Sequence, residues 1–312
     1  MSDYLHNHKN FRDLLRIVGA ELNIEPGLIE KDYWIMHVLH GLKQQGFQFE
    51  LKGGTSLSKG YGIIHRFSED IDIHIKPPAE MEINENPNNN KARNIQKRKD
   101  FYDGLANEIK INGIIAVKRD KAFDDLRQYR SGGIRLHYKS TAEAIEGVKE
   151  GILLEVGFDT VTPNNPLTVS SWAYDKAVQQ GVDIIDNRAI DIACYHIGYT
   201  FVKKLQTIAT KFRQEQEDKE ERQNLMRQYY DVYSLLRDDK VKAFIGTKEY
   251  QKHKEARFPP IPITDNEAFL LKNLELRERF IERYKKTAKL YYKGQPDFDK
   301  LLVEIGKWVE KL

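Results

Sequence analysis

Residues 51–75 read LKGGTSLSKGYGIIHRFSEDIDIHI, and this stretch decides the fold. A Gly-Gly-Thr-Ser turn at 53–56 follows an apolar strand, and a second strand begins near Asp70 after a short helix. In that second strand, Asp70 and Asp72 alternate with isoleucines. Successive side chains of a β-strand point to opposite faces, so both carboxylates share one face and the isoleucines share the other.

Two carboxylates on one strand face, beside a glycine turn, suit a Mg²⁺–nucleotide site. Mg²⁺ prefers oxygen ligands, and a pair of metal ions about 3.5–4 Å apart can hold the attacking and leaving oxygens of a transfer reaction. A further strand, GILLEVGF at 151–158, presents Glu155 on the face opposite its main apolar residues. We therefore predict Asp70, Asp72 and Glu155 as metal ligands. The alternative is that these acids are ordinary residues on the exposed face of a sheet.

The glycine turn itself predicts a nucleotide-binding loop. Gly53 and Gly54 let the backbone approach phosphates where a Cβ atom would obstruct. Hydroxyl groups, and a lysine one helical turn later, add donors and positive charge. The predicted binding residues are Gly53, Gly54, Thr55, Ser56, Lys59 and Ser68. The alternative is a plain strand-to-helix turn with an N-cap, in which Ser68 is only a turn residue.

Bulk composition sets limits on the protein class. The chain has 312 residues, which is long enough for two domains. Of these residues 31% are charged, and the mean hydropathy is −0.64. No stretch approaches the roughly 18 apolar residues that span a bilayer, and the N-terminus lacks the apolar run of a signal peptide. A single cysteine, Cys194, excludes an internal disulfide. We expect a cytoplasmic protein without a membrane partner.

The net charge of +3 is small, but basic residues are unevenly distributed. A solvated helix face explains any one group, whereas several groups beside a phosphate-type site favour an RNA or nucleotide partner. The basic groups are Lys91, Arg93, Lys97, Arg98 and Lys99; Lys203, Lys204, Lys211 and Arg213; and Arg283, Lys285, Lys286, Lys289 and Lys293.

Periodicity divides the chain into two parts. From about Asp186 onward we expect no strands, only amphipathic helices with apolar spacings of three and four residues. The predicted domains are 1–185 and 186–312. Expected helices cover 11–22, 26–44, 57–65 and 93–112, and expected strands cover 47–52, 71–75, 113–118, 133–138 and 151–158. The resulting fold class is α+β with a C-terminal helical domain.

Lys204 and Asp231 lie in the helical part. A lysine and an aspartate facing a cleft can neutralise phosphate charge and orient an acceptor. Their spacing alone does not separate them from other charged residues of those helices.

The chain resembles the AbiEii/AbiGii toxin family, nucleotidyltransferases of bacterial abortive-infection and toxin–antitoxin systems. The resemblance rests first on LKGGTSLSKGYGIIHRFSEDIDI at 51–73, which matches the family's first motif closely. It continues through GILLEVGFD, TFVKKLQTIATKFR and RQYYDVYSLL to the C-terminal YKKTAKLYYKGQPDFDKLLVEIGKWVEKL. The resemblance thus covers nearly the whole chain, and its first motif is highly specific.

This resemblance implies a polymerase-β-like nucleotidyltransferase core, a mixed sheet flanked by helices, with an added helical domain. Its metal-binding carboxylate pair corresponds to Asp70 and Asp72, and its lysine and aspartate of the helical part correspond to Lys204 and Asp231. Relatives transfer nucleotides from NTPs, in some cases to the 3′ end of tRNA, and so block translation. A separately encoded antitoxin usually neutralises them. The position before Lys204, commonly Glu in relatives, is Lys203 here.

Three functions follow as hypotheses. The first is a Mg²⁺-dependent nucleotidyltransferase toxin that acts on RNA, in particular the tRNA 3′ end. The second keeps this chemistry but modifies a protein side chain. The third is a non-catalytic protein that binds nucleotide or RNA and regulates a partner.

Overall fold

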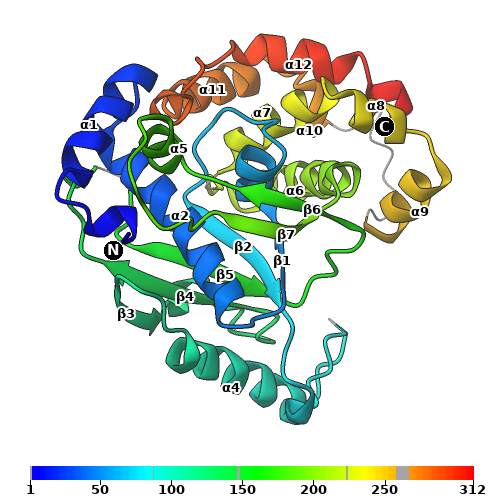
Figure 1. The fold of residues 1–312 in the computed structure, drawn as a ribbon. Coiled ribbons are helices and arrows are strands. Elements are labelled where there is room, and N and C mark those ends of the chain that lie inside the picture. Colours follow the sequence, from blue (N-terminus) through cyan, green and yellow to red (C-terminus); the bar gives the residue numbers. More distant parts are fainter. Residues whose placement is uncertain (1, 87, 146–147, 223, 258–266) are drawn as a thin grey trace. The chain divides into compact units, whose positions relative to one another are not determined.

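The computed structural model describes residues 2–86, 88–145, 148–222, 224–257 and 267–312 (Figure 1). Its internal contacts divide the chain into two compact units, residues 1–60 with 68–195 and residues 61–67 with 196–312. The division falls ten residues after the boundary predicted at 185. It also assigns the short segment 61–67, which we had placed in the first domain, to the second unit.

A mixed sheet with strand order β3-β4-β5-β2-β1-β7-β6 forms the first unit. The inner strand β2 pairs antiparallel with β1 and parallel with β5, and β1 pairs parallel with β7. This arrangement confirms the predicted α+β class with a mixed sheet. The strands are β1 (Phe49–Lys52), β2 (Asp70–Ile75), β3 (Ile114–Arg119), β4 (Ser131–Tyr138), β5 (Ile152–Gly157), β6 (Asn164–Val169) and β7 (Ala189–Tyr195).

The two faces of β2 differ as its sequence predicts. Ile71, Ile73 and Ile75 are buried, whereas Asp70 and Asp72 are only half-buried. The isoleucine face is the core side of the sheet. Alternate side chains of a strand share a face, so apolar residues of the neighbouring strands lie on this side as well. Helices α2 and α4 pack on the sheet, α2 against β5 and β7 and α4 against β3 and β4 (Figure 1).

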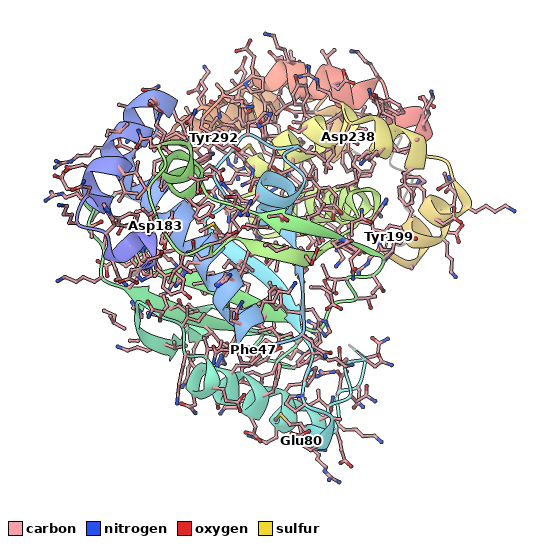
Figure 2. All side chains as sticks on the ribbon, viewed as in Figure 1. Phe47, Glu80, Asp183, Tyr199, Asp238 and Tyr292 are labelled. Atoms are coloured by element: carbon pink, nitrogen blue, oxygen red, sulfur yellow. The ribbon has the colours of Figure 1, made fainter. Side chains whose placement is uncertain are left out.

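Helices of the first unit follow local signals closely. Helix α2 runs from Pro26 to Gln44 as predicted, with its proline in the first turn, where no backbone N–H is needed. It is buried nearly all round, because α1 and α5 pack on it as well as the sheet, and the side chains fill the space between them (Figure 2). The helices are α1 (Phe11–Leu22), α2 (Pro26–Gln44), α3 (Gly53–Thr55), α4 (Ala92–Glu108) and α5 (Trp172–Gln179), with short 3₁₀ turns at Leu5–Asn7, Ala79–Met81 and Lys121–Phe123.

Two local predictions are wrong. The helix predicted at 57–65 is instead the short α3 followed by one π-helical stretch, Ser56–Gly60, and residues 61–67 are not helical. The expectation of no strand after Asp186 fails because Ala189–Tyr195 forms β7. This strand extends alongside β1, so tertiary pairing rather than a strong alternating pattern defines it.

The second unit is helical. Helix α7 (Leu225–Leu236) buries Leu225, Tyr229, Val232 and Leu236, the apolar stripe that the sequence predicts. Within the described residues, no helix combines the length and the apolar character needed to cross a bilayer. The other elements are α6 (Ile197–Asp218), α8 (Asp239–Phe244), α9 (Lys248–Arg257), α10 (Glu267–Leu270), α11 (Leu274–Lys285) and α12 (Phe298–Gly306), with 3₁₀ turns at Ala288–Leu290 and Val309–Lys311.

Candidate active site

The glycine turn packs directly against the carboxylate of Asp72. Gly53 has a φ of +73°, a backbone conformation that favours glycine. A Cβ atom at this position would collide with Oδ2 of Asp72 and lie 2.9 Å from its Cγ. The first glycine of the motif therefore serves two purposes, a left-handed backbone and a close approach to the acid.

Replacing Gly53 by alanine should disable the site more than its backbone strain alone explains. Gly46 provides the matched control, because its φ is +83° and nothing lies within 4 Å of a Cβ placed there. Both substitutions carry the left-handed penalty of roughly 1–2 kcal/mol, but only Gly53→Ala displaces Asp72. We expect nucleotidyl transfer to fall with Gly53→Ala and to persist with Gly46→Ala when both proteins are folded. Equal activity of the two variants would contradict this packing.

Two hydroxyl groups of the turn point into the protein. Thr55 Oγ1 donates a hydrogen bond of 2.6 Å to the backbone carbonyl of Asp70, which ties the turn to β2. Ser56 is fully buried. Both side chains are buried beneath the turn. The phosphate contacts predicted for Thr55 and Ser56 stay a prediction.

Lys59 is paired within the protein. Its Nζ lies 2.8 Å from Oδ1 of Asp32, a fully buried carboxylate on α2, and 4.5 Å from the centre of the Trp172 ring. The structure therefore gives Lys59 a different partner from the predicted triphosphate. Ser68 is half-buried and lies two residues before β2.

Glu155 faces Asp72 across two adjacent parallel strands, as their register shows. Burial raises the pKa of Glu155 to about 8, and the neighbouring charges of Asp72 and Asp70 and a side-chain hydrogen bond with Asp72 add to this. Lys52, opposite Asp72 on β1, acts in the other direction. The raised pKa of Glu155 favours its protonated form, which can donate the hydrogen bond to Asp72.

The pKa of Asp70 is raised as well. Burial raises its pKa to about 6, followed by repulsion from Asp72 and Glu69, while Lys31 and Arg135 partly offset the rise. A carboxylate stays charged only where nearby positive charge or hydrogen bonds compensate for lost hydration. The acidic face of β2 is thus short of positive charge.

Sequence reasoning missed Lys31 and Arg135, the two cations that act on Asp70. Lys31 Nζ donates to the backbone carbonyl of Lys149 at 2.7 Å, and Arg135 is held by Asp120 at 2.7 Å. Lys31 is buried on helix α2, and Arg135 is buried on strand β4. Strand order brings them near β2, and no local motif signals it.

The three carboxylates have the oxygen ligands that a hard divalent cation prefers, but they do not surround a common point. Asp70, Asp72 and Glu155 offer only oxygen atoms, which Mg²⁺ prefers, and burial leaves their charge uncompensated. Nevertheless, no three His, Cys, Asp or Glu side chains among the described residues converge as a metal-binding group. Glu155 forms a side-chain hydrogen bond with Asp72, and the assignment of Asp70, Asp72 and Glu155 as metal ligands stays a prediction.

The metal-free protein should lose stability as the pH rises. The pKa of Glu155 is about 8 in the folded protein and near 4.5 when exposed, so the folded state holds a proton that unfolding releases between these values. Stability therefore falls as the pH rises from about 4.5 to 8, and Asp70 adds a smaller loss between about 3.8 and 6. Urea unfolding in EDTA at pH 6 and pH 9 measures this difference.

Glu155→Gln should flatten that pH dependence, and Glu150→Gln, an exposed site at the start of the same hairpin, should leave it unchanged. A wild-type profile in the Glu155→Gln protein would show that this group does not titrate as described.

A buried ion cluster lies in the second unit. Asp231, with no exposed surface, accepts two hydrogen bonds of 2.7 Å from Arg66, and Lys204 Nζ lies 2.8 Å from its Oδ2. Burial would raise the pKa of Asp231, but Arg66 and then Lys204 outweigh it and hold the pKa below its ordinary value. Lys204 also donates to Gln228 at 2.8 Å.

These contacts give the cluster a clear structural role. Both oxygens of Asp231 are occupied, so its charge fixes Arg66 and Lys204 rather than accepting a proton. Arg66, which sequence reasoning missed, belongs to the segment 61–67 of the second unit. The catalytic role predicted for Lys204 and Asp231 stays a prediction.

The comparison with known families decides the identification. The family described as "Nucleotidyl transferase AbiEii toxin, Type IV TA system" matches residues 39–304, which is most of the chain. The chain belongs to the AbiEii toxin family. The matched range includes the glycine turn, the acidic face of β2, Glu155 and the Asp231 cluster. No curated protein matches this chain.

Membership in the AbiEii family carries a definite meaning. It makes the protein a nucleotidyltransferase toxin of a type IV toxin–antitoxin system, and such a system implies a cognate antitoxin as partner. The α+β unit with its mixed sheet is the nucleotidyltransferase core of this AbiEii protein, and the C-terminal helices complete the chain.

Proposed function

We propose that this AbiEii protein transfers a nucleoside monophosphate from an NTP to RNA, at the 3′ end of tRNA, and thereby blocks translation. One observation carries the proposal: the Asp72 carboxylate packs against the Gly53 turn, with Asp70 on the same strand face and Glu155 opposite. A glycine turn packed against a carboxylate, with two more acids on the adjoining strands, suits a triphosphate and its cation, whereas a simple surface turn would not need the close contact between Gly53 and Asp72.

In this proposal, the hydroxyl oxygen of the acceptor bonds to the α-phosphorus of the NTP. The bond between the α-phosphorus and its bridging oxygen breaks, pyrophosphate leaves, and the hydroxyl loses its proton. The backbone at Gly53 and Gly54 would bind the triphosphate, since only small residues allow this approach. Thr55 would hold the turn on β2 through its bond to the Asp70 carbonyl.

Asp70 and Asp72 would hold Mg²⁺, which supplies charge stabilisation at the transferred phosphoryl group when bound. Glu155 would act beside them, as a third ligand or as the proton-bearing neighbour that orients Asp72. Two charged side chains frame these acids: Lys52 across from Asp72 and Arg135 beside Asp70.

The acceptor is the part of this proposal to be tested first. Purified protein, Mg²⁺, each α-labelled NTP in turn and a cell extract form the reaction, and aliquots are then treated with RNase or protease. We expect RNase to release the label and protease to leave it bound. Label that resists RNase and is lost with protease would identify a protein acceptor instead. NTP binding without any labelled product would indicate the non-catalytic hypothesis.

A further inference from the structure

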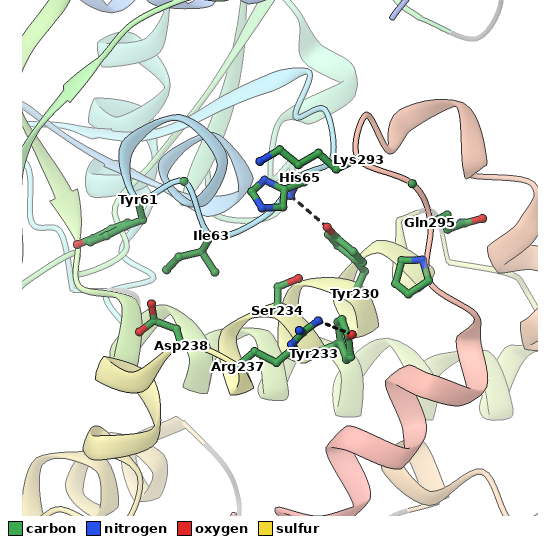
Figure 3. Close-up of a pocket in the computed structure, with 13 residues that line it drawn as sticks. Tyr61, Ile63, His65, Tyr230, Tyr233, Ser234, Arg237, Asp238, Lys293 and Gln295 are labelled. Atoms are coloured by element: carbon green, nitrogen blue, oxygen red, sulfur yellow. Dashed lines mark hydrogen bonds between the residues drawn. The ribbon is translucent and has the colours of Figure 1, made fainter. Parts of the chain in front are cut away.

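Helix α7 has a second, more polar face besides its apolar stripe. Residues 230, 233, 234 and 237 follow the spacing of three and four that places side chains on one side of a helix. They are Tyr230, Tyr233, Ser234 and Arg237, and all four line one pocket of about 780 Å³ within the second unit (Figure 3). Of these four, Tyr230 is buried, Tyr233 and Ser234 are half-buried, and Arg237 is exposed.

Two other segments complete this pocket, which we call the α7 pocket. His65, at the end of segment 61–65, is bonded to both sides of the pocket: Tyr292 N donates to its carbonyl at 3.2 Å, and its own N–H donates to the Tyr230 hydroxyl at 3.1 Å. The loop 293–296 forms a further wall, and its Gly294 has a φ of +83°. The pocket is thus built from ordered segments of a single unit.

The α7 pocket carries positive charge at two points. Arg237 Nη1 donates to the Tyr233 hydroxyl at 2.7 Å, and its guanidinium lies 5.2 Å from the centre of that ring (Figure 3). Lys293 is exposed and forms no ion pair with any described carboxylate. Tyr61 adds a further aromatic ring to the lining. Cations and aromatic rings in one pocket are the combination that binds single-stranded nucleic acid.

The acid of the pocket does not cancel this charge. Asp238 Oδ1 accepts hydrogen bonds from the backbone N–H groups of Lys240 and Val241, at 2.9 and 3.2 Å, and so caps α8. A single carboxylate engaged in a helix cap makes a poor cation site, since Mg²⁺ needs several free oxygen ligands. The α7 pocket therefore suits a phosphodiester better than a Mg²⁺-bound triphosphate.

We propose that the α7 pocket binds one nucleotide of the acceptor RNA strand, with its phosphate at Arg237 and Lys293 and its base against the tyrosine rings. This inference rests on the proposed RNA acceptor and names where part of that strand is held. RNA is favoured over a free NTP by the lack of a carboxylate cluster. It is favoured over an acidic protein segment by the partly exposed rings of Tyr61 and Tyr233, since stacking on bases needs rings and ion pairing alone does not.

Fluorescence anisotropy with a 5′-labelled single-stranded RNA of about 12 nucleotides, within the usual footprint of such sites, tests this binding. The probe variant is Arg237→Gln/Lys293→Gln. The matched control is Arg279→Gln/Lys272→Gln, which removes the same charge at exposed positions of the second unit outside the pocket. Circular dichroism and urea unfolding confirm that all proteins are folded.

We expect the probe variant to bind this RNA roughly tenfold more weakly, and to lower the salt slope by about 1.4, as two lost phosphate contacts would. The control variant should bind like wild type. Tyr233→Leu should weaken binding more than Tyr233→Phe, because phenylalanine keeps the ring and loses only the hydroxyl that accepts a hydrogen bond from Arg237.

Unchanged RNA binding by the probe variant would overturn the inference. The inference would also be overturned if the probe variant bound RNA normally and lost only NTP binding or antitoxin binding. A failure of the proposed function is recognised separately: wild-type protein would then place no nucleotide label on RNA, whatever its affinity for the oligonucleotide. If label is transferred equally well by the probe variant and wild type at low RNA concentration, the proposed function stands and the α7 pocket is excluded.

Discussion

Asp72→Asn is expected to abolish nucleotidyl transfer while the protein stays folded. The carboxylate lies against the glycine turn and faces Glu155, so it is the central acid of the site. Losing a metal ligand removes several kcal/mol of charge stabilisation, and about 1.4 kcal/mol corresponds to tenfold in rate. We therefore expect transfer to fall by roughly a thousandfold. Growth inhibition in cells should be lost together with transfer.

Stability should not fall with Asp72→Asn. The amide removes one of the negative charges that raise the pKa values of Asp70 and Glu155, so the melting temperature should stay equal or rise. Asp100→Asn, an exposed carboxylate of α4, is the matched control and should retain full activity. A folded Asp72→Asn protein that transfers nucleotide at the wild-type rate would remove this face of β2 from the mechanism.

Asp231→Asn, in contrast to Asp72→Asn, is expected to lower the stability of the folded protein. The substitution leaves Arg66 and Lys204 buried without their counter-charge. Removing one partner of a buried ion pair typically costs about 3–5 kcal/mol. Urea unfolding should show this loss, and growth inhibition should weaken because less folded protein accumulates. Asp239→Asn, whose side chain is 96% exposed, should change stability little.

A triple variant separates stability from chemistry at this cluster. Arg66→Met, Lys204→Met and Asp231→Leu together replace all of its charges with apolar side chains, which often restores the stability that a single change loses. We expect the triple variant to unfold near the wild-type urea concentration. An Asp231→Asn protein as stable as wild type would contradict the structural role of the cluster. Transfer by a stable triple variant would show that Lys204 and Asp231 are not catalytic residues.

The parts of the fold that sequence predicts well are those set by neighbours along the chain. The alternation of Asp70, Ile71, Asp72 and Ile73 gives the two faces of β2, because strand geometry alone decides which residues share a face. Proline in the first turn marks the start of α2 for the same local reason. The resemblance then supplied the family.

The parts that sequence misses depend on residues far apart. Arg66 and Asp231 are separated by 165 residues, and nothing near either one indicates their pairing. Lys59 seemed available for phosphate because its partner Asp32 lies on a different helix. Arg98 of the first basic group is likewise buried, donating to the backbone carbonyls of Asn84 and Asn86. Charge counts along a chain therefore overestimate the positive surface that is left for RNA.

The central claim is that this protein performs nucleotidyl transfer at the acidic face of β2. The most direct measurement compares α-labelled and γ-labelled NTP as donors, with total tRNA as acceptor, Mg²⁺, and wild-type or Asp72→Asn protein. The account predicts α-label on tRNA with wild type only, and no γ-label in either reaction, because pyrophosphate leaves with the γ-phosphate. Transfer of the γ-label, or equal α-labelling by the folded Asp72→Asn protein, would contradict it.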